Sequence, residues 1–215
     1  MVLVAPSMLA ADFLRLEKEV ELVNRCGDLF HLDIMDGTFV PNISFGFPVV
    51  HAIAGAAKKP MDAHLMIVNP GNYIERFAGE GISMLSFHLE AAGEETGTLL
   101  EKIRGFGMKA GLAINPDIPV ERLFPYLDSL DYVLIMSVFA GFGGQKFMAE
   151  SLDRIRTVKE EIRRRGLDVQ IEVDGGIGRD NAAALSDAGA DILVAGSSVF
   201  KAEDPCAAIE YIRVP

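Results

Sequence analysis

The stretch HLDIMDG, residues 31–37, begins like a buried strand and then departs from the pattern of one. A parallel strand that is covered on both faces is normally a near-continuous hydrophobic run. Leu32 and Ile34 keep to that pattern, whereas His31 and Asp33 share the opposite face. Because burying an imidazole and a carboxylate is costly unless each is paired or binds a metal, this face is expected to serve a function.

Short apolar runs alternate with stretches of helical period along the rest of the chain. We expect strands at residues 2–9, 29–35, 61–66, 84–88, 108–114, 132–137, 170–173 and 192–195. We expect helices at residues 14–24, 46–57, 71–80, 94–105, 120–127, 150–165, 180–188 and 205–212, with Asp180 as an N-cap. This alternation predicts a single (β/α)₈ TIM barrel that spans residues 1–215. The alternative, a doubly wound open sheet, would favour GxGxxG after the first strand, where residues 5–13 contain no glycine.

The composition excludes several classes of protein. Half of the 215 residues are hydrophobic, yet no run approaches the roughly 20 apolar residues of a membrane span, and the first residues lack a signal-peptide pattern. A net charge of −11 argues against nucleic-acid binding, which needs a basic face. The two cysteines, Cys26 and Cys206, are far apart and outside any CxxC, which argues against a disulfide framework. We therefore expect a cytoplasmic protein with neither a nucleic acid nor a membrane as partner.

Ionisable residues fall where barrel enzymes do their chemistry, at the C-terminal ends of the strands. His64 lies near the end of MDAHLM (61–66), and Asp174 near the end of the strand in QIEVDGG (170–176). Two imidazoles and two carboxylates suit a first-row divalent metal such as zinc, iron(II) or manganese. The candidate ligands that converge on the barrel mouth are His31, Asp33, His64 and Asp174.

Each of these residues alone is more often structural, because a lone strand histidine is usually a core residue and an Asp before Gly-Gly usually forms a turn. The metal hypothesis depends on four of them falling at three strand ends on one face. Asp62 and Glu172 lie two residues deeper, and we interpret them as partners that support the ligands. His51 is expected on a helix surface, and His88 either supports the site or lies at its rim.

Glycine-rich segments follow the last three strands: AGFGGQ at residues 140–145, a Gly-Gly pair at 175–176 and GSS at 196–198. In barrels, phosphate often binds between the last two βα loops and the N-terminus of a short extra helix. Glycine lets backbone N–H groups approach phosphate oxygens closely. One Gly-Gly can be a simple turn, but three such segments on adjacent loops predict a phosphate cradle. Both serines of GSS can donate hydroxyls, and Lys146 is the only lysine nearby.

Several of these segments together resemble the serial motifs of the ribulose-phosphate 3-epimerase family. The resemblance runs from Pro6 to about Asp204, and its most specific parts are HLDIMDG-x-FVPN and GFGGQKF. The other segments that carry it are PSMLAADF, MDAHLM, IEVDGGI and VAGSSVF. The resemblance implies a (β/α)₈ barrel isomerase that interconverts D-ribulose 5-phosphate and D-xylulose 5-phosphate through an enediolate.

The resemblance also implies roles for individual positions. It implies that a divalent metal, zinc above iron(II) or manganese, is held by His31, Asp33, His64 and Asp174. It implies that Asp33 and Asp174 are the acid and base, that Ser7 and His64 lie near the sugar, and that no redox cofactor is needed. It implies that three methionines flank the reacting carbons: Met35, Met66 and Met136. It implies phosphate contacts at Gly141, Phe142, Gly143, Gly144, Gly175, Gly176, Gly196 and Ser197.

The chain departs from the family pattern at two points. Phe139 and Ala140 precede GFGG where the family usually has a proline, and Ala10 replaces a usual Ser or Asn. D-Allulose-6-phosphate 3-epimerases share most of the motifs, so a six-carbon substrate stays open, as does a non-catalytic sugar-phosphate sensor. A Schiff-base aldolase or a decarboxylase would need a strand-end lysine, and Lys109 falls at the opposite end of its strand. Family members are dimers or hexamers, which implies a homo-oligomer.

Overall fold

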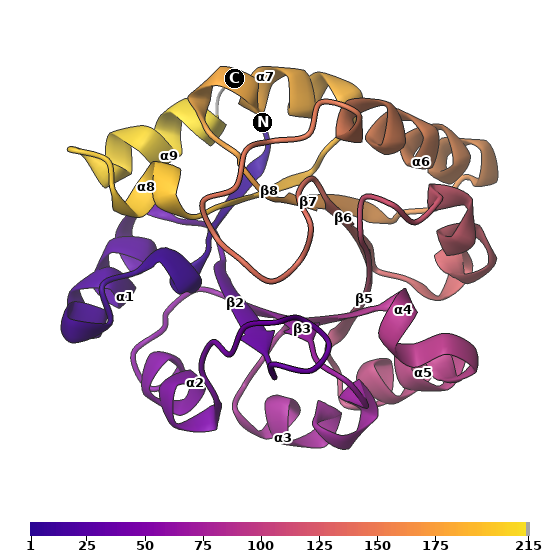
Figure 1. Cartoon of the computed structure of the whole chain (residues 1–215), viewed down its shortest axis with the longest axis horizontal. Helices are drawn as coiled ribbons and strands as arrows, with labels where there is room; N and C mark the ends of the chain where they lie inside the picture. Colours follow the sequence, from indigo (N-terminus) through magenta and orange to yellow (C-terminus); the bar gives the residue numbers. More distant parts are fainter. Residues whose placement is uncertain (214–215) are drawn as a thin grey trace.

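The computed structural model describes residues 1–213 and contains one sheet of eight parallel strands, ringed by helices (Figure 1). The sheet order is β1-β8-β7-β6-β5-β4-β3-β2, and an isolated parallel bridge between Ser7 and His31 joins its two edges. The predicted (β/α)₈ barrel is therefore confirmed. The strands are β1 (Leu3–Pro6), β2 (Phe30–Met35), β3 (Met61–Met66), β4 (Met84–His88), β5 (Lys109–Ile114), β6 (Tyr132–Met136), β7 (Gln170–Asp174) and β8 (Ile192–Ala195).

The helices lie outside the sheet. The α-helices are α1 (Leu16–Cys26), α2 (Phe47–Ala54), α3 (Ile74–Gly79), α4 (Leu89–Ala92), α5 (Thr96–Gly105), α6 (Ser151–Arg165), α7 (Arg179–Ala188), α8 (Ser197–Phe200) and α9 (Pro205–Arg213). The 3₁₀ turns are η1 (Met8–Ala10), η2 (Phe13–Arg15), η3 (Pro70–Asn72), η4 (Gly93–Glu95) and η5 (Val120–Ser129). Within residues 1–213, none of these helices combines the length and the apolar character needed to cross a membrane.

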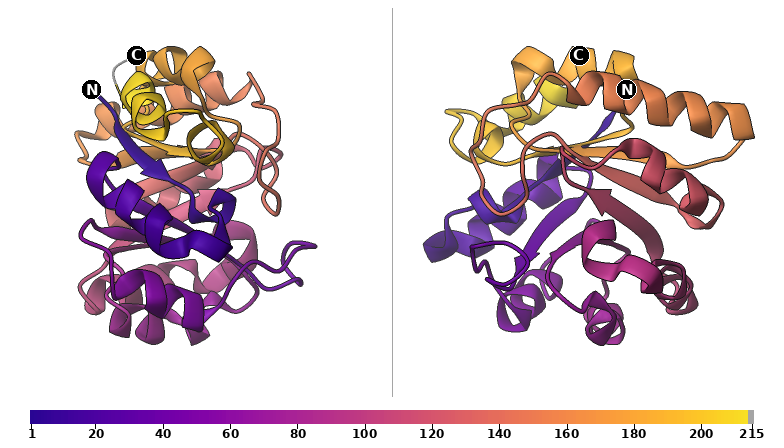
Figure 2. Two further views of the ribbon diagram at one scale, coloured as in Figure 1. Left: turned by 90° about the vertical axis from the view of Figure 1, so that its left-hand side faces the viewer. Right: turned by 45° about the vertical axis from the view of Figure 1, so that its right-hand side comes forward.

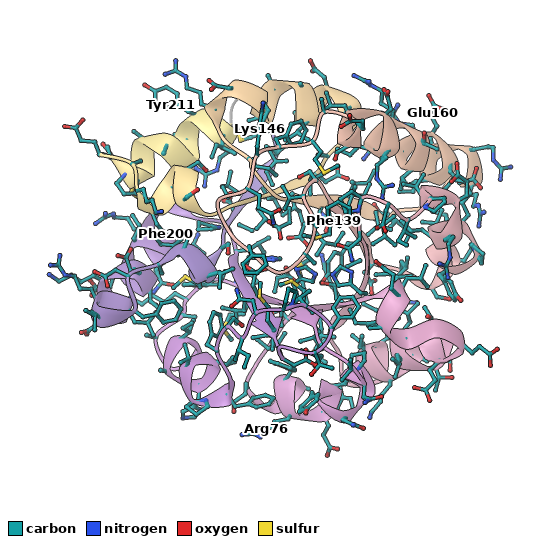
Figure 3. The ribbon with its side chains drawn as sticks, in the orientation of Figure 1. Arg76, Phe139, Lys146, Glu160, Phe200 and Tyr211 are labelled. Atoms are coloured by element: carbon teal, nitrogen blue, oxygen red, sulfur yellow. A yellow bond between two sulfur atoms is a disulfide. The ribbon has the colours of Figure 1, made fainter. Side chains whose placement is uncertain are left out.

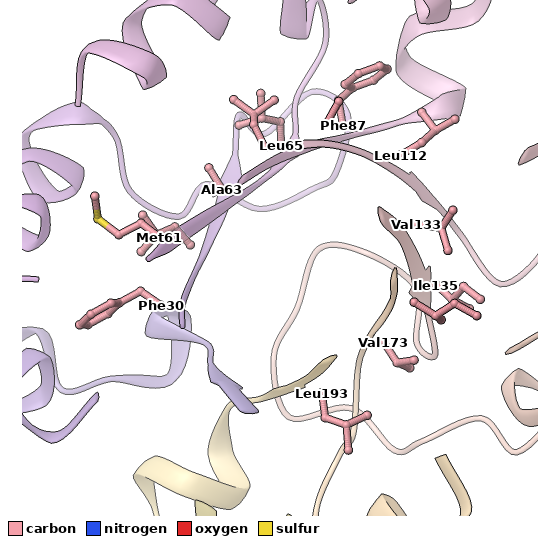
Figure 4. Packing of buried hydrophobic residues seen from close by; sticks show 14 of the residues in the cluster. Phe30, Met61, Ala63, Leu65, Phe87, Leu112, Val133, Ile135, Val173 and Leu193 are labelled. Carbon is pink, nitrogen blue, oxygen red and sulfur yellow. The ribbon is translucent and has the colours of Figure 1, made fainter. Parts of the chain in front are cut away.

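Alternation along each strand divides the barrel into two regions. One set of side chains points away from the barrel and packs under the helices, including Phe30, Leu65 and Ile135, all fully buried (Figure 4). Each large aliphatic or aromatic side chain buried in this way contributes about 1.5–3 kcal/mol to folding. The other set points into the barrel, and the strand register pairs Asp33 with His64. The sheet thus brings residues from separate strands into one layer.

Three local expectations are corrected by the structure. The first strand ends at Pro6 rather than at residue 9, because the chain turns into η1. The segment expected as a helix at 120–127 is the 3₁₀ helix η5, whose internal Pro125 cannot donate an α-helical hydrogen bond. Helix α7 is capped by Gly178, and Asp180 lies in its first turn instead of at the N-cap.

The sequence argued against a disulfide framework, yet the structure joins the two cysteines in a single disulfide. Cys26 ends α1 and Cys206 lies in the first turn of α9, and their sulfur atoms are bonded across 180 residues of sequence. Their Cα atoms are 5.4 Å apart. Barrel closure places the first and last helices next to each other, so the large separation in sequence did not indicate separation in space.

Two long loops project from the same end of the barrel (Figure 2). One follows β2 and covers residues 36–46, and the other follows β6 and covers residues 137–150. The side-chain amide of Asn42 donates a 2.8 Å hydrogen bond to the carbonyl of Gly141 and so joins the two loops. This end of the barrel, where the strands have their C-termini, is where the candidate site lies.

Candidate active site

A cavity of about 900 Å³ opens at the C-terminal end of the barrel. Nearly all of the side chains and glycines predicted from the sequence line it: Ser7, Asp33, Met35, Met66, Met136, Gly141, Phe142, Gly143, Gly144, Asp174, Gly175, Gly176, Gly196 and Ser197. His31 and His64 are fully buried and lie against Asp33 rather than on the cavity wall. The cavity is large enough for a small phosphorylated metabolite, since ligand pockets typically have about 300–1,000 Å³.

The four candidate metal ligands lie close together beside this cavity, which Asp33 and Asp174 line and the two histidines do not reach. One ligand atom from each of His31, Asp33, His64 and Asp174 lies within 4.8 Å of the others. Asp33 Oδ1 is 3.5 Å from His31 Nε2 and 3.5 Å from His64 Nδ1, and Asp174 Oδ2 is 4.0 Å from His64 Nδ1. The atoms come from β2, β3 and β7, which only the closed barrel brings together.

The chemistry of these atoms fits a divalent cation. His31 Nε2 and His64 Nδ1 are buried and have no hydrogen-bond partner among residues 1–213. Buried polar atoms are nearly always paired, so two unpaired imidazole nitrogens aimed at the same carboxylate indicate a ligand-binding role. Tetrahedral coordination with bonds of about 2.0–2.2 Å separates neighbouring ligand atoms by about 3.3–3.6 Å, which matches the two 3.5 Å spacings.

His31 is oriented from below by a buried chain of hydrogen bonds. Its Nδ1 is 2.6 Å from Asp62 Oδ2, and the hydroxyl of Tyr132 donates to Asp62 Oδ1 at 2.7 Å. Nδ1 therefore carries the proton, which leaves Nε2 free to act as a ligand. The Tyr132 ring is fully buried and crosses the barrel interior beside Gly111, where any larger residue would collide with it. Glu172 lies 3.5 Å from His31 Nδ1.

His64 is supported by a different arrangement. Its Nε2 is 2.9 Å from Nε2 of His88, and the two rings stack with centroids 5.0 Å apart. His88 is fully buried, and its Nδ1 is 3.5 Å from a carboxylate oxygen of Glu90. The sequence left open whether His88 supports the site or lies at its rim. The structure places it behind His64, where it supports a candidate ligand. His51, by contrast, is exposed on α2 as expected.

The two aspartates differ in their electrostatic surroundings. Burial alone would raise the pKa of Asp33, but His31 and His64 outweigh it and hold that pKa far below its usual value. Burial and the charge of Asp33 raise the pKa of Asp174 to about 7. Burial lowers the pKa of His64 to about 4, which keeps its imidazole neutral at physiological pH. One carboxylate and one group that can hold a proton therefore face the same cavity.

The opposite wall of the cavity is rich in glycine and in backbone N–H groups. Gly176 has a left-handed φ of 64°, and a side chain there would collide with the backbone of Phe147. Gly196 precedes α8, a short extra helix whose first N–H groups have no acceptor within the helix. A Cβ on Gly196 would lie 3.3 Å from Cβ of Ala10, so the departure from the family pattern at position 10 borders this wall.

Two expectations about this wall change. The hydroxyl of Ser198 donates to the carbonyl of Ile177 at 2.6 Å and is therefore already occupied. Lys146 is joined at the cavity by Lys201, which sequence spacing did not single out because it lies beyond the strand-eight motif on the far side of α8.

Apolar side chains cover the centre of the cavity. Met35 and Met66 form one buried cluster with Val40, and Ala140 packs against it. Phe139 lies over the barrel opening (Figure 3) and is half exposed, and Lys146 lines the cavity. Val40, Phe139 and Ala140 come from the two projecting loops, whereas Met35 and Met66 end β2 and β3. The loops and these strand ends together limit access of water to the carboxylates.

Two residues that support the site were not predicted from the sequence: Tyr132, which contacts Asp62, and Asn115, which contacts Glu90 and Ala140. Tyr132 begins β6 and reads as an ordinary strand aromatic, and Asn115 follows β5 in a loop. Tyr132 could have been recognised, because it points into the barrel next to Gly111, which leaves room for its ring. Asn115, whose side-chain oxygen accepts from the N–H of Ala140, stands in a loop without any pattern that would single it out.

The barrel, the strand-end carboxylates and the glycine-lined wall define a class of protein: a TIM-barrel enzyme that acts on small molecules at the C-terminal face of its strands. The sequence from residue 3 to residue 200 matches the model of the ribulose-phosphate 3 epimerase family, and the chain belongs to that family. It is thus an isomerase of the racemase and epimerase class.

The relatives agree with this assignment over nearly their whole length. The chain is 46% identical to ribulose-phosphate 3-epimerase of Synechocystis sp. over 214 residues, covering 99% of this chain and 93% of the relative. It is 44% identical to the Bacillus subtilis protein of the same name, covering 99% of both. The structure of KGPDC from Streptococcus mutans matches with a TM-score of 0.74 at 12% identity, covering 99% of this chain and 95% of that one, which supports the fold alone.

Proposed function

We propose that this protein is a metal-dependent 3-epimerase that interconverts D-ribulose 5-phosphate and D-xylulose 5-phosphate. One observation carries the proposal: two carboxylates and two unpaired imidazole nitrogens converge beside a cavity whose opposite wall is lined with glycine. Relatives named ribulose-phosphate 3-epimerase support the substrate. A homo-oligomer, either a dimer or a hexamer, and a cytoplasmic location belong to the same proposal.

In this proposal His31, Asp33, His64 and Asp174 hold the divalent metal, with Zn²⁺ preferred and Fe²⁺ or Mn²⁺ chemically acceptable. The ion would stabilise negative charge on the sugar oxygens as a Lewis acid. The protein's part is to keep the ligand atoms available. Asp62 fixes a proton of His31 on Nδ1, and the low pKa of His64 keeps its imidazole neutral.

Epimerisation inverts the carbon next to a ketone, so a proton must leave one face of the sugar and another must arrive on the opposite face. Asp33 on β2 and Asp174 on β7 are suited to the two faces. Asp33, with its lowered pKa, is the carboxylate that removes a proton, and Asp174 can hold the proton that is delivered. The roles exchange in the reverse direction. Ser7 donates a 2.6 Å hydrogen bond to Asp33 Oδ2 and orients it.

The remaining residues bind and enclose the substrate. Backbone N–H groups at Gly143–Gly144, Gly176–Ile177 and Gly196–Ser198 would bind the phosphate, with Lys146 and Lys201 nearby. The three methionines, Met35, Met66 and Met136, would cover the reacting carbons with polarisable, water-excluding surface. Fixing the phosphate at one end and the reacting carbons at the other holds the sugar in a single orientation, which is why two acid/base groups are needed.

D-Allulose 6-phosphate is the alternative substrate. Phe139 and Ala140 stand at the loop position where the family pattern has proline, and Phe139 lies over the opening. A comparison of initial rates for the two sugar phosphates, with metal-loaded protein and with chelator, separates the candidates. A faster reaction of the six-carbon sugar would identify that alternative, and loss of neither reaction with chelator would remove the metal from the proposal.

The two-carboxylate mechanism is tested with Asp33→Asn and Asp174→Asn, which keep size and one oxygen but remove proton transfer. Each should lower epimerisation by about 10²- to 10⁴-fold. In D₂O each variant should still exchange the C3 hydrogen of one epimer slowly, and the two variants should prefer opposite epimers. Metal content is measured in parallel, because both residues are proposed ligands. A metal-loaded variant with a near wild-type rate would refute the assignment.

A further inference from the structure

His88 is a buried group that the proposed reaction does not use. Its Nε2 faces His64, its Nδ1 faces Glu90, and the ring of Phe39 packs on it with centroids 4.8 Å apart. His88 has no exposed surface, so it does not contact a ligand in the cavity. Its only polar neighbours among the described residues are the proposed metal ligand, Glu90 and the side chain of Asn115.

The hydrogen-bond pattern fixes where the protons lie. Two imidazole nitrogens that are 2.9 Å apart need one proton between them. If Nδ1 of His64 offers its lone pair to a cation, the neutral ring carries its proton on Nε2 and donates it to His88. Nε2 of His88 then accepts, so Nδ1 of His88 carries a proton, which points to Glu90 Oε1 at 3.5 Å. With a cation on Nδ1 of His64, the three side chains thus have one consistent set of donors and acceptors.

Asn115 extends this group to the loop after β6. Its backbone N–H and its side-chain amide both donate to Glu90 Oε1, at 3.0 and 2.9 Å. Its side-chain oxygen accepts the N–H of Ala140 at 3.0 Å. A proline at position 140 has no N–H and could not make this bond. The loop that lies over the cavity is therefore tied, through two side chains, to the residue behind His64.

We propose that His88, Glu90 and Asn115 are positioning residues: they hold His64 in the tautomer that presents Nδ1 to the metal, and they couple it to the loop at Ala140. The inference rests on the proposed metal site. Partners of this kind orient a ligating histidine, and their loss typically weakens metal binding about 10- to 100-fold. The arrangement also requires a hydrogen-bond acceptor at position 88. A ring of the same size without an acceptor would not be sufficient.

The first test measures the dissociation constant of Zn²⁺ by chelator competition in the purified full-length protein. His88→Phe keeps the ring and removes the acceptor, and it should weaken binding about 10- to 100-fold. His88→Gln places an amide oxygen near the same position and should restore an affinity close to that of wild type. His51→Phe, on the surface, is the matched control and should change nothing. Equal affinity of His88→Phe and wild type would overturn the proposal, as would failure of glutamine to rescue it.

Glu90→Gln provides the same test if His88→Phe fails to fold. The side chain is partly exposed, so the substitution is tolerated more easily, and it removes the charge that fixes the proton of His88. Weaker Zn²⁺ binding at an unchanged melting temperature of the metal-free protein supports the positioning role of Glu90 and His88. Unchanged Zn²⁺ binding by a folded Glu90→Gln protein contradicts it.

The coupling to the loop is tested with Ala140→Pro, which removes one N–H, and with Ala140→Gly, which keeps it. Ala140→Pro should weaken Zn²⁺ binding, and its effect should be non-additive with His88→Phe by about threefold or more. Ala140→Gly should bind like wild type. Additive effects would refute the coupling. His31→Ala separates the two proposals. If this variant binds Zn²⁺ like wild type, the metal site itself is misassigned. If it loses Zn²⁺ binding strongly while His88→Phe does not, only the positioning role of His88, Glu90 and Asn115 is refuted.

Discussion

Replacing Tyr132 with phenylalanine tests the buried chain that orients His31. The change removes one oxygen and keeps the ring that fills the space beside Gly111. That oxygen donates to Asp62 Oδ1 at 2.7 Å, and both side chains are fully buried, so no water can replace the donor. Asp62 keeps its contact with His31 through its other oxygen. The perturbation is therefore confined to one hydrogen bond.

The expected cost follows from the charge and burial of Asp62. Hydrogen bonds to charged groups contribute about 1.5–3 kcal/mol, and a buried oxygen left without its donor loses that contribution. For a domain of this size, each kcal/mol lowers the melting temperature by about 2–4 °C, so Tyr132→Phe should melt about 3–12 °C below wild type. Zn²⁺ affinity should fall by less than the roughly 10- to 100-fold expected for losing a direct partner of the histidine.

Two measurements check this prediction. Thermal unfolding of the metal-free protein gives the stability change, and chelator competition gives the metal affinity. Tyr73→Phe is the matched control, because the Tyr73 side chain is 40% exposed and its hydroxyl makes no hydrogen bond with the described residues. A Tyr132→Phe protein that melts and binds Zn²⁺ like the control would show that the phenol does not support His31.

Three further predictions concern the phosphate, the disulfide and pH. Gly196→Val should raise KM for the sugar phosphate strongly, whereas Lys146→Ala and Lys201→Ala should raise it less; the reverse order would mean that lysines bind the phosphate. Cys26→Ser should lower the melting temperature under oxidising conditions by about 4–16 °C, from a typical 2–4 kcal/mol, and thiol reductant should then have no further effect. Burial and Asp33 raise the pKa of Asp174 to about 7, and, against the effect of burial, Asp33 and Asp62 raise the pKa of His31 well above its usual value. Because metal must displace both protons, Zn²⁺ affinity measured by chelator competition should rise with pH through about 7 and continue to rise above it. Asp174→Asn should flatten that rise, and a flat wild-type profile would contradict the assignment.

The sequence by itself determined the barrel and the residues at the mouth of its cavity. Strand and helix periods are local properties, so the alternation along the chain predicted all eight strands to within a few residues. The same local alternation put His31 and Asp33 on one face of β2, where their polarity marked a functional position. The glycine segments after the last strands could be recognised as a phosphate cradle, because the backbone freedom of glycine is a local property of the residue.

Only the tertiary structure decided which of these residues support one another. Tyr132 contacts Asp62 across 70 residues of sequence, and its partner is set by the register around the closed barrel rather than by its own strand. His88 could have been a rim residue until the structure placed it 2.9 Å from His64. Barrel closure likewise brought Cys26 beside Cys206. Hydrogen-bond partners and disulfide pairing depend on the distance and direction between side chains, which periodicity along the chain does not contain.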